Sequence, residues 1–144
     1  MLGTGAKWLQ VLEQRGMKPI KSHKLEDLRA ILSTGSPLAA SSYDYIYRDI
    51  KTNIMLSSIA GGTDIIGCFF AATSDFPVYR GMLSPPSLGF KLGAVNSDGN
   101  ICDSNEPGDL VCFNPFPSMP RSFLNDASGE KYDKAYTVVL LNIL

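Results

Sequence analysis

A short polar segment, Gly61-Gly62-Thr63-Asp64, carries groups that could do chemistry. It follows the apolar run Ile54-Met55-Leu56, and a second apolar run begins at Ile65. Glycines let the backbone approach a ligand closely, a threonine hydroxyl forms hydrogen bonds, and an aspartate offers hard oxygen suited to magnesium or to a polar substrate group. The pattern indicates a buried strand that ends in polar groups, at the edge where open α/β sheets bind ligands.

The same segment also fits a purely structural role. A strand followed by an ordinary turn, with Thr63 or Asp64 capping a helix, would have the same residues in the same order. Short glycine motifs recur often by chance. From the spacing alone, both interpretations stay open.

Composition limits the classes of protein and partner. With 144 residues, 44% of them hydrophobic, the chain can bury one core. The net charge is −1 and no block of Lys and Arg occurs, so nucleic acid and anionic membranes are poor partners. The longest apolar stretches, residues 65–72 and 138–141, are far shorter than the ~20 residues that span a bilayer, so we expect no transmembrane segment.

The cysteines indicate a reducing compartment. Cys68, Cys102 and Cys112 are odd in number and form no close pair, so neither a disulfide framework nor a zinc site is indicated. The amino end also lacks the charged-then-apolar order of a secretory signal. We therefore expect a cytosolic protein.

The first 72 residues have the pattern of part of an α/β layer. The sequence predicts a helix over residues 4–15, capped by Thr4 and ended by Gly16. A brief helix around residues 25–28 and a strand over residues 29–33 are expected next, although periodicity cannot decide between helix and strand in so short a run.

An apolar stripe at helical spacing follows Pro37 and comprises Tyr43, Ile46, Tyr47 and Ile50. The stripe predicts a helix with one side facing the core, which leaves Arg48 and Lys51 in solvent. Because the strand ending in the polar segment comes next, the order is strand, helix, strand. This order is typical of a parallel crossover unit.

The composition changes after Ala72. Gly, Pro, Asn and Ser recur every few residues and separate three short apolar pieces, at residues 90–95, 110–113 and 135–141. Residues 96–100, Asn-Ser-Asp-Gly-Asn, are typical of a hairpin turn. We therefore predict an α/β layer over residues 1–72 and, over 73–144, a β-rich subdomain built as a small antiparallel sheet or barrel.

Several motifs, in order, resemble the acetoacetyl-CoA synthetase family of the adenylate-forming superfamily. Residues 32–38, Leu-Ser-Thr-Gly-Ser-Pro-Leu, resemble the loop that contacts adenine, and residues 57–64 resemble the superfamily segment Tyr-Gly-x-Thr-Glu. An ordered series is stronger support than one glycine pair. Further matches are Gly108-Asp109-Leu110-Val111, Pro115-Phe116-Pro117-Ser118-Met119-Pro120, Phe123, Asn125-Asp126, Lys131-Tyr132 and Ala135-Tyr136, while Leu124 replaces an expected Trp.

The resemblance implies an ATP-dependent ligase of the adenylate-forming fold. ATP and acetoacetate would give an acyl-adenylate and pyrophosphate, and CoA would then displace AMP to give acetoacetyl-CoA. The substrates would be acetoacetate, ATP and CoA, with Mg²⁺ as the cofactor. This activity belongs to ketone-body use in lipid metabolism.

The resemblance also implies roles for residues at matching positions. Gly35, Ser36 and Pro37 would line the adenine pocket. Thr63 would hydrogen-bond the α-phosphate, and Asp64, at the position of the motif glutamate, would hold Mg²⁺.

Three small residues would lie beside the acyl pocket. They are Ala60, Gly61 and Gly62, and Gly62 would also contact the nucleotide. Small side chains leave room there for a short polar acid.

Other parts of the family pattern do not occur in these residues. No Ser/Thr/Gly-rich loop ending in Lys is present, and residues 137–144 depart from the segment that leads to the ribose-binding Asp. The resemblance thus implies that the remainder of the enzyme chain is missing, and we expect the segment to be inactive alone. The alternative is a non-catalytic fragment that binds nucleotide weakly or acts as an interaction module.

The remaining candidates favour structural roles. His23, the only histidine, is expected to be exposed, and Cys68 is expected to be a buried thiol rather than a nucleophile. Asp126 and Glu130 are expected in solvent rather than as a catalytic acid pair. The segment Tyr79-Arg80-Gly81 fits a surface loop as well as a ligand contact.

Overall fold

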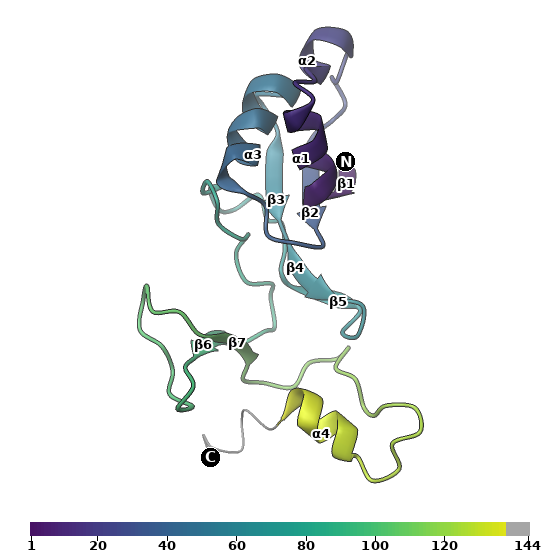
Figure 1. The fold of residues 1–144 in the computed structure, drawn as a ribbon, viewed down its shortest axis with the longest axis vertical. Coiled ribbons are helices and arrows are strands. Elements are labelled where there is room, and N and C mark those ends of the chain that lie inside the picture. Colours follow the sequence, from purple (N-terminus) through teal and green to yellow (C-terminus); the bar gives the residue numbers. More distant parts are fainter. Residues whose placement is uncertain (138–144) are drawn as a thin grey trace. The chain divides into compact units, whose positions relative to one another are not determined.

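The computed structural model describes residues 1–137, which fall into two compact units (Figure 1). The first unit comprises Met1–Gly62 and Gly67–Ser87. The second comprises Thr63–Ile66 and Leu88–Leu144, of which residues 138–144 lie outside the described part. Each unit is described by itself below.

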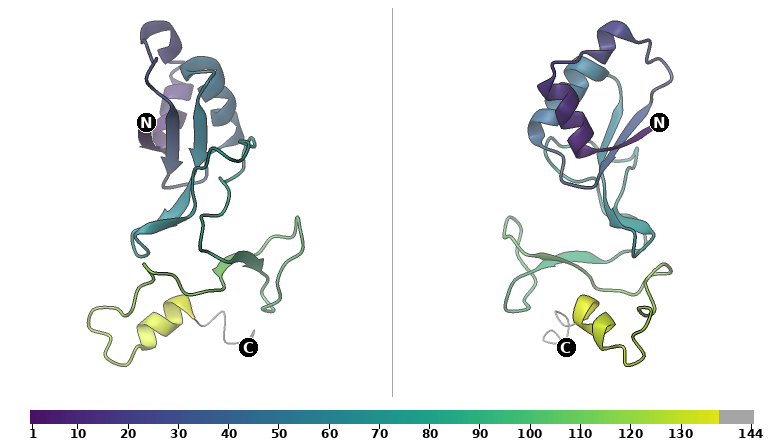
Figure 2. Two further views of the ribbon diagram at one scale, coloured as in Figure 1. Left: turned by 180° about the vertical axis from the view of Figure 1, so that it is seen from behind. Right: turned by 45° about the vertical axis from the view of Figure 1, so that its right-hand side comes forward.

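The first unit is built on a three-stranded parallel sheet. Strands β1 (Leu2–Gly5), β2 (Ala30–Thr34) and β3 (Met55–Ser58) lie in that order, with β2 in the middle. Helices α1 (Ala6–Gln14) and α3 (Ala40–Tyr45) cover one face of the sheet (Figure 2). A π-helical turn, η1 (Ile46–Ile50), continues α3, and the short helix α2 (Pro19–Ser22) follows α1. The predicted parallel crossover from β2 to β3 is therefore confirmed.

The first helix begins later than the sequence predicts. Residues 2–5 form a strand, Gly5 precedes the helix, and no side chain caps the helix, so the assignment of Thr4 as a cap is wrong. The reason is tertiary pairing, because Thr4 lies opposite Ser33 in the β1–β2 ladder. The predicted end is confirmed, since Gly16 adopts a φ of 60°, a left-handed conformation that favours glycine.

The core of the first unit lies between the sheet and its helices. The predicted stripe after Pro37 is confirmed as core-facing, because Tyr43, Ile46 and Ile50 are buried and Tyr47 packs against the cluster. The hydroxyl of the buried Tyr45 donates to the Met17 carbonyl at 2.9 Å. The cluster comprises Ala6, Leu9, Leu12, Ile31, Leu38, Tyr43, Tyr45, Ile46, Ile50, Ile54 and Leu56.

Lys51 holds a loop rather than facing solvent, so the prediction for its side chain is wrong. Its ammonium donates to the carbonyl oxygens of Leu25, Glu26 and Leu28 at 2.5, 3.0 and 2.8 Å. These carbonyls belong to a turn, and the brief helix expected there does not form. A lysine suits the position because its three N–H groups can satisfy three carbonyls that no helix uses.

The segment that follows the polar motif returns along β3. Strands β4 (Ala60–Gly62) and β5 (Gly67–Phe70) form an antiparallel hairpin. Farther along, the Ser84 amide donates to the Ser58 carbonyl at 2.9 Å, and the Ser57 and Ser84 hydroxyls lie 2.6 Å apart. These bonds give the outer edge of β3 a partner along part of its length.

Two side chains of α3 hold the same returning loop. The hydroxyl of Tyr43 donates to the Met82 carbonyl at 2.5 Å. Arg80 forms a two-pronged ion pair with Asp44, with a shortest distance of 2.8 Å. Arg80 is thus tied to α3 by a protein contact, which supports the surface-loop interpretation of this segment.

The second unit contains a small antiparallel sheet and one helix. Strands β6 (Leu92–Val95) and β7 (Asp109–Cys112) pair, and helix α4 spans Glu130–Tyr136. The predicted turn at residues 96–100 is confirmed, with Gly99 at a φ of 83°. The third expected strand is wrong at residues 135–136, which are helical, and its remainder lies outside the described residues apart from Thr137.

The fold class is confirmed as α/β with a β-rich part. The antiparallel sheets in residues 1–137 have two strands each and close no barrel. Within the same residues, no helix combines the length and apolar character needed to cross a membrane.

Candidate functional site

The polar segment lies just beyond the carboxyl end of β3. Ile59 follows β3 and donates its amide to the Ser33 carbonyl at 2.9 Å, and β4 begins at the next residue. Thr63–Ile66 forms the turn between β4 and β5. Because the chain turns back into a strand, neither Thr63 nor Asp64 caps a helix. Their side chains are exposed and accessible to a ligand.

Gly61 is a glycine because the hairpin leaves no room for a side chain. The β4–β5 register shifts between Ala60 and Gly61, and a Cβ at residue 61 would collide with the Gly67 carbonyl and the Cys68 backbone. The backbone at Gly61 therefore does make a close approach, and its neighbour is strand β5. Whether a ligand also approaches it stays a prediction.

Asp64 has a partner that sequence reasoning did not identify. The Tyr136 hydroxyl donates to Asp64 Oδ2 at 2.8 Å, across 72 positions of sequence. The pKa of Tyr136 is raised, chiefly because this hydrogen bond to a carboxylate favours the protonated phenol, and burial adds to the effect. In the sequence, Tyr136 is marked only as one member of an ordered series of motifs.

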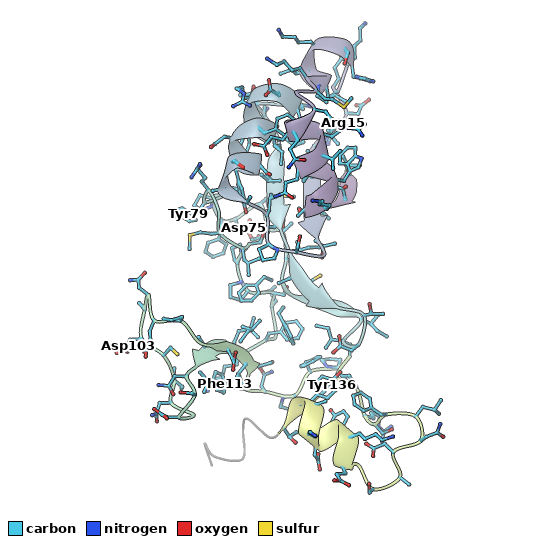
Figure 3. All side chains as sticks on the ribbon, viewed as in Figure 1. Arg15, Asp75, Tyr79, Asp103, Phe113 and Tyr136 are labelled. Atoms are coloured by element: carbon cyan, nitrogen blue, oxygen red, sulfur yellow. The ribbon has the colours of Figure 1, made fainter. Side chains whose placement is uncertain are left out.

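The ring of Tyr136, labelled in Figure 3, is held by two other aromatic rings. Its centroid lies 5.6 Å from that of Phe123 and 5.1 Å from that of Tyr132. Tyr132 is itself fixed, because its hydroxyl donates to the Pro120 carbonyl at 2.6 Å. These contacts leave the phenol few orientations.

Asp126 organises the start of α4, which corrects the expectation that it is merely solvated. Its carboxylate accepts from the backbone amides of Lys131 and Tyr132 at 3.3 and 2.9 Å. Amides of a first helical turn have no partner within the helix, so a carboxylate there is stabilising. Glu130 is exposed, as expected.

The loop predicted to bind adenine follows β2 in the first unit. Gly35 has a φ of 83°, which favours glycine, and Ser36 and Pro37 are exposed. Thr63 and Asp64 belong to the second unit. Their proximity to this loop therefore stays a prediction.

A single carboxylate is available for a metal at the turn. Among the described residues, no group of three His, Cys, Asp or Glu side chains could hold a metal ion, and no protein donor contacts Asp64 Oδ1. Magnesium commonly takes one or two carboxylates and completes its shell with substrate phosphates and water. Asp64 thus fits a magnesium ion that arrives with a nucleotide, and does not fit a cage made of protein alone.

The first unit also contains a hollow that includes none of the predicted site residues. It lies between the edge of β3 and the returning loop, and Ser57, Phe76 and Leu83 are among its lining residues. Tyr79, from the segment that fits a surface loop as well as a ligand contact, also lines this hollow.

His23 and the cysteines offer no competing site. His23 is exposed, as expected, and its Nδ1 lies 2.8 Å from the Ser22 hydroxyl. Cys68, Cys102 and Cys112 are free thiols of intermediate exposure, so Cys68 is less buried than expected.

Comparisons with known proteins first show the fold. No family model matches the chain. The fold matches the anthranilate CoA ligase AuaEII in complex with anthranoyl-AMP, with a TM-score of 0.70 at 16% identity, covering 90% of this chain and 24% of that one. This match shows that the fold is shared with a segment of a CoA ligase.

Further matches are with acetoacetyl-CoA synthetases. The chain is 51% identical over 136 residues to acetoacetyl-CoA synthetase of Xenopus tropicalis, and 41% identical to that of Rhizobium meliloti (strain 1021). The structure of acetoacetyl-CoA synthetase from Streptomyces lividans matches with a TM-score of 0.85 at 31% identity, covering 96% of this chain and 22% of that one. Over 94% of its length, the chain is therefore similar to a segment of acetoacetyl-CoA synthetases.

The coverage of the relatives is partial. The Xenopus match includes 94% of this chain and 20% of the relative. The chain thus spans about a fifth of the length of the curated relatives that it matches.

Proposed function

We propose that this chain supplies the phosphate- and metal-binding segment of an ATP-dependent acetoacetate–CoA ligase. The observation that carries the proposal is the exposed Thr63-Asp64 pair, at the turn that follows the end of a parallel sheet. A hydroxyl and a free carboxylate oxygen at this position suit a metal-bound phosphate. The similarity to acetoacetyl-CoA synthetases supports the choice of substrates.

The chemistry gives each group a task. A carboxylate becomes a good electrophile only after its oxygen is joined to a leaving group, which adenylation provides. Attack on the α-phosphate concentrates negative charge, and magnesium, when bound, neutralises part of it. Thr63 would donate a hydrogen bond to the α-phosphate, and Asp64 would hold the metal.

The other proposed contacts concern the adenine and the acyl group. Gly35, Ser36 and Pro37 would form one wall of the adenine pocket, and Gly62 would contact the nucleotide through its backbone. Ala60 and Gly61 would border the acyl group. CoA would enter as the second substrate.

Catalysis would require groups beyond these 144 residues, because they include no Ser/Thr/Gly-rich loop ending in Lys to hold the triphosphate. We therefore propose binding without turnover for this chain alone, in the cytosol. The partial coverage of the relatives also favours a second candidate, a non-catalytic module that binds nucleotide weakly or binds another protein.

Titration calorimetry with ATP and magnesium tests the binding proposal. The chain should bind, and the double variant Thr63→Ala/Asp64→Ala should lose at least about tenfold in affinity, because a metal ligand and a phosphate donor are both removed. Asp98→Ala is the matched control, since it removes one exposed aspartate from the same unit. Equal affinities of the wild type and the double variant would contradict the proposed site.

Exchange between ATP and pyrophosphate, driven by acetoacetate, tests the reaction. A version extended to the length of the relatives should catalyse exchange, and the 144-residue chain should not. Exchange by the short chain would refute binding without turnover. Lack of exchange by the extended version would favour the non-catalytic module.

A further inference from the structure

Asp64 reaches out from a four-residue turn, so its own backbone does little to fix its carboxylate. The backbone hydrogen bond within Thr63–Ile66, from the Ile66 amide to the Thr63 carbonyl, is long at 3.4 Å. Ile66 adopts a φ of 47°, which is unusual for a β-branched residue. A carboxylate on such a turn needs an outside contact to keep one orientation.

The Tyr136 hydroxyl provides that contact. It donates to Oδ2 at 2.8 Å, a bond to a charged acceptor that is stronger than a neutral one. Because Oδ2 is engaged and no donor within residues 1–137 contacts Oδ1, that oxygen is left for a ligand. One phenol therefore selects both the rotamer of Asp64 and the oxygen that it presents.

The phenol is itself fixed before any ligand binds. Its ring contacts the rings of Phe123 and Tyr132, and α4, which ends at Tyr136, is anchored at its start by Asp126. Donors held in place before binding cost little reorganisation when the ligand arrives.

We propose that Tyr136 is a positioning residue that orients Asp64 toward a nucleotide-bound magnesium ion. The inference rests on the proposed function, in which Asp64 holds that ion. It adds a role for a residue of α4, remote in sequence from the turn. Tyr136 acts through Asp64 and has no contact with the reacting atoms in this role.

The first experiment measures the contact without nucleotide, by amide hydrogen exchange in the 144-residue chain. In Tyr136→Phe, the Ile66 amide should exchange about three- to tenfold faster, because the turn loses a hydrogen bond to a charged group. Tyr79→Phe is the control, since it removes an exposed phenol that is no part of this aromatic group. Unchanged exchange in Tyr136→Phe would overturn the inference.

The second experiment measures magnesium dependence. At a fixed ATP concentration, the magnesium concentration for half-maximal nucleotide binding should rise about three- to tenfold in Tyr136→Phe and more in Asp64→Asn. It should stay at the wild-type value in Tyr79→Phe. A residue that only anchors the turn would change the exchange rate and leave the magnesium midpoint unchanged.

The outcomes separate the inference from the proposed function. If the wild type binds magnesium and ATP, and Asp64→Asn weakens binding while Tyr136→Phe does not, the positioning role is wrong and the site stands. If the wild type shows no magnesium-dependent binding, the proposed function fails and the positioning role fails with it.

Discussion

At the scale of single residues, one buried hydroxyl, that of Tyr43, joins the core of the first unit to the returning loop. Tyr43 is 2% exposed, and its hydroxyl is bonded to the Met82 carbonyl. Burial raises the pKa of Tyr43, so the phenol stays protonated as a donor. The tyrosine joins the core to the returning loop, a role that a phenylalanine could fill only in part.

Tyr43→Phe should lower the free energy of unfolding by about 1–2 kcal/mol, because the Met82 carbonyl loses its donor. Urea denaturation followed by circular dichroism measures the change. Tyr79→Phe, at a tyrosine that is 62% exposed, should have no measurable effect. If Tyr79→Phe lost as much stability as Tyr43→Phe, this explanation would be refuted.

The ion pair between Arg80 and Asp44 predicts a pH effect at one residue. The hydrogen bond from Arg80 lowers the pKa of Asp44 below its ordinary 3.8. Because the folded pKa is the lower one, the stabilisation is present above the unfolded value and disappears as the pH falls through the folded value.

Melting temperatures of the wild type and Asp44→Asn should therefore differ slightly at pH 5 to 7, and the difference should disappear as the pH falls below the ordinary pKa of 3.8 and through the lower folded value. The effect should be small, since both side chains are exposed and solvent screens the pair. A difference that persists unchanged at low pH would show that the charge of Asp44 is not responsible.

At the scale of elements, the anchoring of α4 decides whether Tyr136 can reach Asp64. The helix has seven residues, and isolated helices of that length are not stable in water. Asp126 and the aromatic contacts therefore do more for this helix than its intrinsic propensity.

Asp126→Ala should destabilise α4 by about 0.5–2 kcal/mol, because two backbone amides lose their acceptor. The amides of Lys131 and Tyr132 should exchange faster in this variant, and hydrogen exchange measures the loss of helix stability. Glu130→Ala, which removes an exposed carboxylate from the first turn, is the control and should change exchange less. Equal effects of the two variants would mean that charge near the helix start matters more than the bonds of Asp126.

Elements with a strong local pattern could be predicted from the sequence. The stripe from Tyr43 to Ile50 indicates its helix because four apolar residues recur at helical spacing, and Gly99 marks its turn through backbone freedom. β1 could not be predicted, since Gly3 and Gly5 have little preference for strands. Its conformation comes from pairing with β2.

The site could be predicted only in part, because one of its contacts also depends on tertiary structure. Thr63 and Asp64 are marked by residue type and by their place after a strand. The Tyr136 contact depends on tertiary structure across 72 residues, which no local pattern records. Lys51 illustrates the same limit, because its three acceptors lie in a turn more than twenty residues earlier.

At the scale of the whole molecule, the two units differ in how much apolar surface they bury. The first unit has a cluster of eleven buried residues, from Ala6 to Leu56. The buried hydrophobic residues described in the second unit are Ile65, Val95 and Val111. Since burial of apolar surface is the main stabilising contribution, the first unit should be the more stable.

Amide exchange at increasing urea concentration should therefore show the second unit opening first. The Val111 amide should exchange at lower urea than the Ile31 amide, which lies in the central strand of the parallel sheet. Identical dependence on urea at both positions, together with one sharp thermal transition of a monomer, would show that the chain unfolds as a single cooperative unit.

The tight approach of β5 to residue 61 restricts how substrate range could be altered by mutation. If the hairpin borders the acyl group, enlarging residue 61 would first force the two strands apart, so a library at this position would yield misfolded hairpins instead of new selectivities. Ala60 already has a side chain and is half-buried, so under the same proposal it would be the position through which a smaller or larger acid is accommodated.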